Sequence, residues 1–62
     1  MTTKCYFLDF CPEVSAVIAY LAESSFCLIH EVTLRVGGYI ALTIECRDAD
    51  LATVERVLAP YV

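Results

Sequence analysis

The chain has 62 residues, 60% of them hydrophobic, and its eight acidic and four basic residues give a formal net charge of −4. This length supports one small domain, residues 1–62, and excludes a multidomain enzyme, while the apolar content excludes a disordered chain. The acidic balance excludes direct binding to nucleic-acid phosphates, which needs clustered lysine and arginine, and an anionic membrane would repel the chain.

The longest nearly apolar run, residues 14–22, is shorter than the roughly 18 residues that a membrane-spanning helix needs. The N-terminal residues lack the pattern of a secretory signal peptide. We therefore expect a cytoplasmic protein. Its four cysteines have no Cys-x-x-Cys spacing, and we expect them to stay reduced and pack as small apolar residues: Cys5, Cys11, Cys27 and Cys46.

Residues 3–10 are rich in strand-forming side chains and predict a β-strand. Alternation places Tyr6, Leu8 and Phe10 on one face and Cys5, Phe7 and Asp9 on the other. A helix over residues 12–23 follows, because proline suits the first helical position and an acidic residue complements the helix dipole in the first turn. Its buried stripe is Val14, Val17, Ile18 and Leu21.

Residues 27–36 and 39–46 alternate in the same way, and Gly37-Gly38 between them predicts a hairpin. A two-residue loop would mix polar and apolar side chains on one face. A three-residue loop, Val36-Gly37-Gly38, restores agreement, with Gly38 in the left-handed region. This loop sets the following pairs opposite one another: Leu34 and Ile40, Val32 and Leu42, and Arg35 and Tyr39.

The last predicted element is a helix that Asp48 or Asp50 caps and that Pro60 ends near Ala59. Its buried stripe is Leu51, Val54, Val57 and Leu58.

The β-α-β-β-α order predicts an α+β domain, a truncated ferredoxin-like sandwich. Its three-stranded sheet has the third strand between the first and the second. Both helices are expected on one sheet face, over Tyr6, Leu8, Phe10, Val32, Leu34, Ile40, Leu42 and Ile44. The outer edge of the first strand is expected to lack a strand neighbour.

The sequence offers little catalytic chemistry, and we expect a protein that is not an enzyme, with no cofactor and no metal. The single histidine, His30, falls on the core-facing parity of its strand, beside Cys46 or Ile44. It serves either as a structural residue or as half of a Cys-His pair, but no third orienting group is evident. Cys5 and Cys11 are about 20 Å apart along a strand, too far to share one zinc ion.

The second sheet face is expected to carry no helix and to mix aromatic with acidic side chains, which suits a protein contact surface. A solvated face is the alternative interpretation. The candidate partner-binding residues on this face are Phe7, Asp9, Glu31, Tyr39 and Glu45.

The element order, with Pro12 opening the first helix and Gly37-Gly38 in the hairpin, resembles a truncated ferredoxin-like or regulatory ACT-like module. In its size, acidity and lack of catalytic motifs the chain also resembles phage-encoded anti-CRISPR inhibitors. The second resemblance implies a non-enzymatic inhibitor that acts as a nucleic-acid mimic on a basic, nucleic-acid-handling protein. The first implies a small regulatory or structural subunit that pairs as a homodimer through the first-strand edge or the uncovered sheet face.

Overall fold

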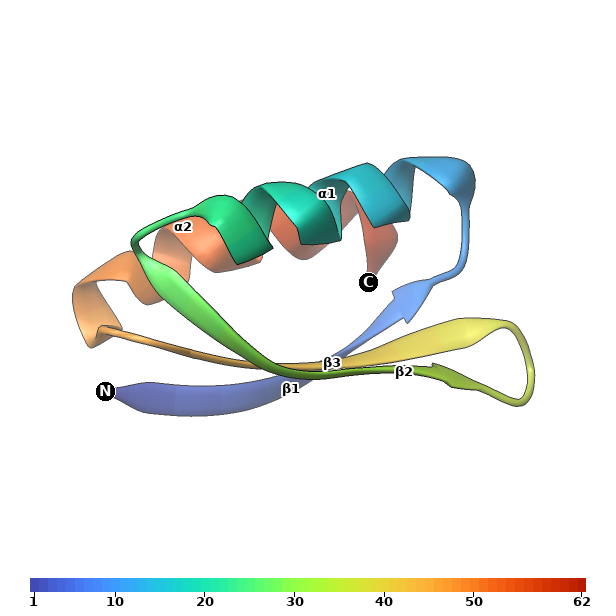
Figure 1. Ribbon diagram of the computed structural model, residues 1–62, viewed down its shortest axis with the longest axis horizontal. Coiled ribbons are helices and arrows are strands. Elements are labelled where there is room, and N and C mark those ends of the chain that lie inside the picture. The colour runs from blue at the N-terminus through green and yellow to red at the C-terminus, as the bar shows by residue number, and fades with distance from the viewer.

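A computed structural model describes all 62 residues. Figure 1 shows a three-stranded sheet with two helices on the same side of it. The elements in chain order are β1 (Thr2–Asp9), α1 (Pro12–Glu23), β2 (Cys27–Arg35), β3 (Tyr39–Cys46), α2 (Asp48–Leu58) and a short 3-10 helix (Ala59–Tyr61).

The sheet order is β1-β3-β2, and β3 pairs antiparallel with both neighbours. The prediction is confirmed in its α+β class, its element order, its sheet order and the placement of both helices on one face. The hairpin register is also the predicted one, with Leu34 opposite Ile40 and Arg35 opposite Tyr39. The requirement that polar and apolar side chains lie on separate sheet faces was therefore enough to predict the length of the hairpin loop.

The hairpin turn uses both of the chain's glycines. Gly38 has a φ of +81°, as predicted, and Gly37 has a φ of +105°, which the sequence did not predict. The Gly38 N–H donates to the carbonyl of Arg35 at 3.3 Å, and the Gly38 carbonyl accepts from the N–H of Phe10 at 3.2 Å. The turn therefore closes the β2–β3 hairpin and also anchors the end of β1.

The hydrophobic core lies between the sheet and the helices. It is built from the predicted stripes of both helices and the helix-facing side chains of β1 and β3: Leu8, Val14, Leu21, Ile40, Leu42, Ile44, Cys46, Val54 and Leu58. Tyr61, in the 3-10 helix that follows α2, packs against this cluster. No helix has the length and apolar character needed to cross a membrane.

Three side chains expected under the helices are exposed. Val32 and Leu34 of β2 have exposed fractions of 47% and 62%, and Phe10 has 57%. Phe10 follows the end of β1, in the extended connection that leads to Pro12. The alternation assigned Val32 and Leu34 to the correct sheet face, but the helices do not cover that part of β2.

A β-bulge in β2 corrects the placement of His30. The register shifts between Ile29, opposite Ile44, and Glu31, opposite Thr43, which leaves His30 as the extra residue. Ile29 packs against the core, whereas the His30 side chain is exposed and contacts Glu45. The core-facing position predicted for His30 is therefore wrong.

The start of α2 also differs from the prediction. Arg47 occupies the N-cap position, without a side-chain capping bond, so neither Asp48 nor Asp50 caps the helix. Both carboxylates lie in the first turn, where they complement the helix dipole. Asp48 accepts a hydrogen bond from the Thr2 hydroxyl, and Asp50 accepts one from Arg47 Nε at 3.1 Å.

Candidate functional site

The sheet face opposite the helices, which we call the open face, has no element packed on it (Figure 1). The strand register orders its side chains in rows across the sheet. From the hairpin end these rows are Asp9-Tyr39-Arg35, Phe7-Ala41-Thr33, Cys5-Thr43-Glu31 and Thr3-Glu45-Leu28. All five predicted partner-binding residues lie on this face.

Phe7 and Tyr39 form the aromatic centre of the open face. Their ring centroids are 5.7 Å apart with an interplanar angle of 78°, an edge-to-face arrangement. The exposed fraction is 57% for Phe7 and 37% for Tyr39, while Ala41 is buried between the neighbouring strands. The pair thus forms an exposed and preorganised apolar surface.

The acidic residues of the open face stand around this aromatic pair. Asp9 lies directly opposite Tyr39 on β1, and Glu31 lies two rows away on β2. The Glu31 carboxylate accepts a hydrogen bond from the Thr33 hydroxyl at 3.0 Å and makes no ion pair. Arg35 provides a positive charge in the same row as Asp9. The face is therefore mixed, with carboxylates in the majority.

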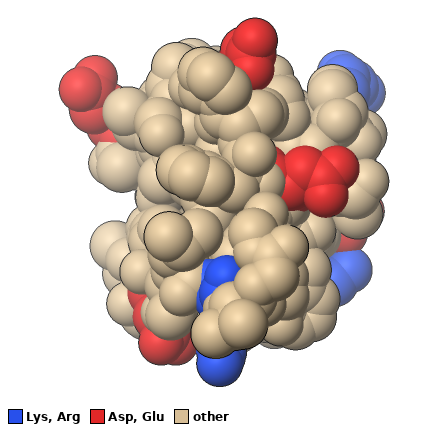
Figure 2. Space-filling model, turned by 90° about the vertical axis from the view of Figure 1, so that its right-hand side faces the viewer, with Lys and Arg blue, Asp and Glu red and all other residues tan.

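Figure 2, which views the hairpin end of the molecule, shows carboxylates as separate groups on a mostly uncharged surface. On this end of the molecule the carboxylates do not form a continuous track like a nucleic-acid backbone.

His30 joins the open face through Glu45, a contact that the sequence analysis missed. Its Nε2 lies 2.9 Å from Glu45 Oε1, and both side chains are partly exposed. The sequence offers no clear signal for the bulge, because Leu28 and Ile29 are both apolar and one of them fits either alternation. Pairing with β3 shows that Ile29 takes the core-facing position and that Leu28 lies opposite Glu45.

A shallow hollow of about 370 Å³ lies at the opposite end of the sheet, lined by Met1 and residues 25–28 and 45–47. Its polar side chains interact with groups elsewhere. Glu45 binds His30, Arg47 binds Asp50, and the Cys27 thiol lies 3.4 Å from the carbonyl of Leu21. These contacts do not form a nucleophile and base pair.

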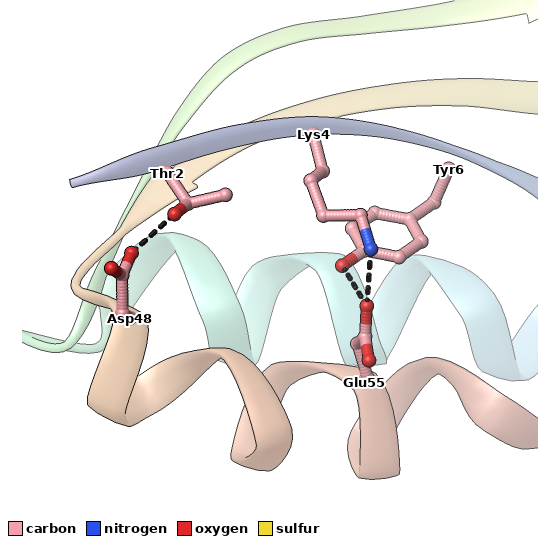
Figure 3. Close-up of polar contacts among 5 residues, drawn as sticks. All are labelled: Thr2, Lys4, Tyr6, Asp48 and Glu55. Atoms are coloured by element: carbon pink, nitrogen blue, oxygen red, sulfur yellow. Dashed lines mark hydrogen bonds and ion pairs between the residues drawn. The ribbon is translucent and has the colours of Figure 1, made fainter.

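A polar network joins β1 to α2 on the helix side of the sheet (Figure 3). Lys4 Nζ and the Tyr6 hydroxyl both donate to Glu55 Oε2, at 2.7 and 2.8 Å, and Thr2 donates to Asp48. Hydrogen bonds from Lys4 and Tyr6 lower the pKa of Glu55. Burial and the bond to Glu55 raise the pKa of Tyr6 well above its usual range. This network fixes α2 over β1.

The cysteines differ in environment. Cys5 is exposed on the open face, Cys11 and Cys27 are half-buried, and Cys46 lies in the core. Burial, followed by the nearby Cys27 and acidic side chains, raises the pKa of Cys46. The expectation of apolar packing is therefore confirmed for Cys46 and for Cys11 and Cys27, which pack against the core, but it is wrong for Cys5. No three metal-ligating side chains gather at one point.

Comparison with models of protein families, with curated proteins and with solved structures finds no match to this chain.

Proposed function

We propose that this protein is a non-enzymatic binding protein that occupies a basic, nucleic-acid-handling surface of a protein partner, as anti-CRISPR inhibitors do. The observation that carries the proposal is the open face, where an exposed edge-to-face aromatic pair lies beside carboxylates. The proposed site consists of Phe7, Asp9, Glu31, Tyr39 and Glu45. The proposed place of action is the cytoplasm, where such partners handle nucleic acid.

The aromatic pair and the carboxylates have different tasks in this proposal. Aromatic side chains at the centre of an interface supply much of the binding energy and slow dissociation. Carboxylates around them attract a basic surface and raise the association rate, an effect that salt screens. Because the charges on the open face are separated, a partner recognises the combination of rings and carboxylates, with individual carboxylates replacing individual phosphates.

The test expresses the protein in bacteria whose CRISPR–Cas systems, one type per strain, restrict a matched phage, and measures plating efficiency. We expect the wild-type protein to relieve restriction in at least one strain. Phe7→Ala and the double substitution Asp9→Lys with Glu45→Lys should abolish the relief. Both leave the helix-side core unchanged, and circular dichroism checks that each variant folds.

The matched control is Glu13→Lys with Glu23→Lys, which changes the net charge equally on exposed α1 positions. It should keep the relief of restriction. Equal loss in the control would mean that only net charge matters, and full activity of the Phe7→Ala variant would exclude the open face. Absence of relief in every strain would contradict the inhibitor proposal.

A further inference from the structure

The outer edge of β2 has no strand neighbour and is apolar on the helix side of the sheet. Val32 and Leu34 are both exposed there, and no lysine lies in β2. β1 has the other free edge, but Lys4 lies on it and is paired with Glu55 of α2. A lysine on an edge strand discourages the addition of another strand. The bulge at His30 also protects part of the β2 edge, but it ends before Val32, so the edge from Val32 to Arg35 is the one open to pairing.

The hydrogen bonds of the turn show which backbone groups of β2 point outward. The Arg35 carbonyl accepts from Gly38 within the turn, and Arg35 lies opposite Tyr39 as the closing pair of the hairpin. In an antiparallel ladder, alternate residues direct both N–H and C=O groups to the same neighbour. Arg35 and Thr33 therefore face β3, whereas Leu34 and Val32 present their N–H and C=O groups to solvent.

We propose that a second copy of this chain docks on this edge, so that two β2 strands pair antiparallel and two three-stranded sheets become one. The pairing is centred on Thr33. It brings Val32 of each copy opposite Leu34 of the other, with four backbone hydrogen bonds between them. The two-fold axis is perpendicular to the sheet, so both helix layers lie on one side, and four apolar side chains meet between them.

Charge complementarity selects this register. Centring on Thr33 places Glu31 of each copy opposite Arg35 of the other, on the open face. Opposite charges directly across an antiparallel pair are stabilising. Centring on Val32 would set Leu34 opposite the bulged His30, and centring on Leu34 would set Val32 opposite Val36 of the turn. Both registers also separate Glu31 from Arg35. The bulge at His30 and the turn at Val36 confine the pairing to the residues between them.

The small core supplies an independent reason for a second copy. Ten side chains are buried, whereas ten large hydrophobic side chains are exposed. A domain of this size has a marginal core, and oligomerisation is one of the ways in which such domains gain stability. An isologous interface also uses one self-complementary patch, which Val32, Leu34, Glu31 and Arg35 provide.

The experiment measures mass by sedimentation equilibrium over a wide concentration range. We expect the wild-type protein to reach twice the chain mass of 6.9 kDa. Glu31→Arg places arginine opposite Arg35, and Arg35→Glu places glutamate opposite Glu31. Each substitution alone should weaken dimerisation by about tenfold or more. An equimolar mixture of the two variants should dimerise with wild-type strength, because every charge then meets an opposite charge.

Glu23→Arg, on the exposed end of α1, is the control and should leave the dimer unchanged. Hydrogen exchange provides a second readout, since the amides of Val32 and Leu34 should become protected only when the dimer forms. A monomer at every concentration would overturn the proposal, as would single variants that dimerise normally or a mixture that does not recover. Because the readout is mass in the absence of any partner, it is independent of the inhibitor proposal.

Discussion

The two edge strands of the sheet follow the same sequence pattern but lie in different environments. Leu8 of β1 and Leu34 of β2 both lie beside Ile40, in one row across the sheet. Leu8 is fully buried, whereas Leu34 has an exposed fraction of 62%. In the next row, Tyr6 is half-buried against α2, whereas Val32 is exposed. Alternation therefore tells which face a side chain joins, but a neighbouring element decides whether the side chain is covered.

Helix length and polar contacts explain the difference. The 12 residues of α1 extend about 18 Å, whereas the nine residues of β2 extend about 30 Å. On the other flank, the bonds of Lys4 and Tyr6 to Glu55 hold α2 over β1 (Figure 3). No comparable polar contact joins α1 to the hairpin half of β2, where Val32 and Leu34 remain exposed.

The largest loss of stability should come from truncating Leu8, the buried member of the Leu8–Ile40–Leu34 row. Leu8→Ala should lower the free energy of unfolding by about 2–5 kcal/mol, because it leaves a cavity under the helices. Leu34→Ala should change it by less than about 1 kcal/mol in dilute solution, because the side chain is mostly exposed. Chemical denaturation of both variants, monitored by circular dichroism, checks the comparison. Equal losses would show that the two flanks are covered alike.

Much of this fold could be predicted from local rules. Pro12 and the apolar stripe around Val14 and Leu21 determine α1, and Gly37-Gly38 determines the hairpin. The register followed from keeping polar and apolar sets apart. These features depend on residues near one another in sequence, or on the alternation of side chains between the two faces of each strand.

The rest depends on contacts that the sequence does not specify. The bulge at His30 moved its side chain to Glu45, and the adjacent apolar residues Leu28 and Ile29 did not reveal which alternation the strand follows. The preference of Asp48 for Thr2 over helix capping needs both strand and helix in place. The open-face residues could be placed on one surface from alternation alone, but the contact of the Phe7 and Tyr39 rings required the pairing of β1 with β3.

The second largest loss of stability should come from a substitution in the turn that joins β2 to β3. Gly38 has a φ of +81°, a conformation that costs an L-residue about 1–2 kcal/mol. Gly38→Ala should lower the free energy of unfolding by that amount, although a Cβ there would meet no neighbouring atom. Thermal unfolding measures the loss. Ser25→Ala, in the α1–β2 connection, is the control, and an unchanged Gly38→Ala variant would contradict the strain argument.

The smallest effect should come from the polar network of the β1 flank, and it should depend on pH. The Lys4 and Tyr6 hydrogen bonds lower the pKa of Glu55 in the folded state relative to its ordinary value of 4.5. The folded protein therefore binds the Glu55 proton less readily than the unfolded chain. This stabilisation is present above pH 4.5 and is lost as the pH falls through the lowered pKa of the folded state.

Glu55→Gln should therefore lower the thermal midpoint at neutral pH, and its difference from wild type should shrink as the pH falls below 4.5. Lys4→Met removes the larger cause of the lowered Glu55 pKa, and Tyr6→Phe removes the smaller one. Both substitutions should therefore reduce the pH dependence of stability, and Lys4→Met should reduce it more. Glu23→Gln, on the exposed end of α1, serves as the matched control because its carboxylate forms no ion pair within the chain. If the thermal midpoints of wild type and Glu55→Gln stay equally far apart as the pH falls into the acid range, the network does not hold α2 over β1. The difference in burial between the two flanks would then rest on apolar packing alone.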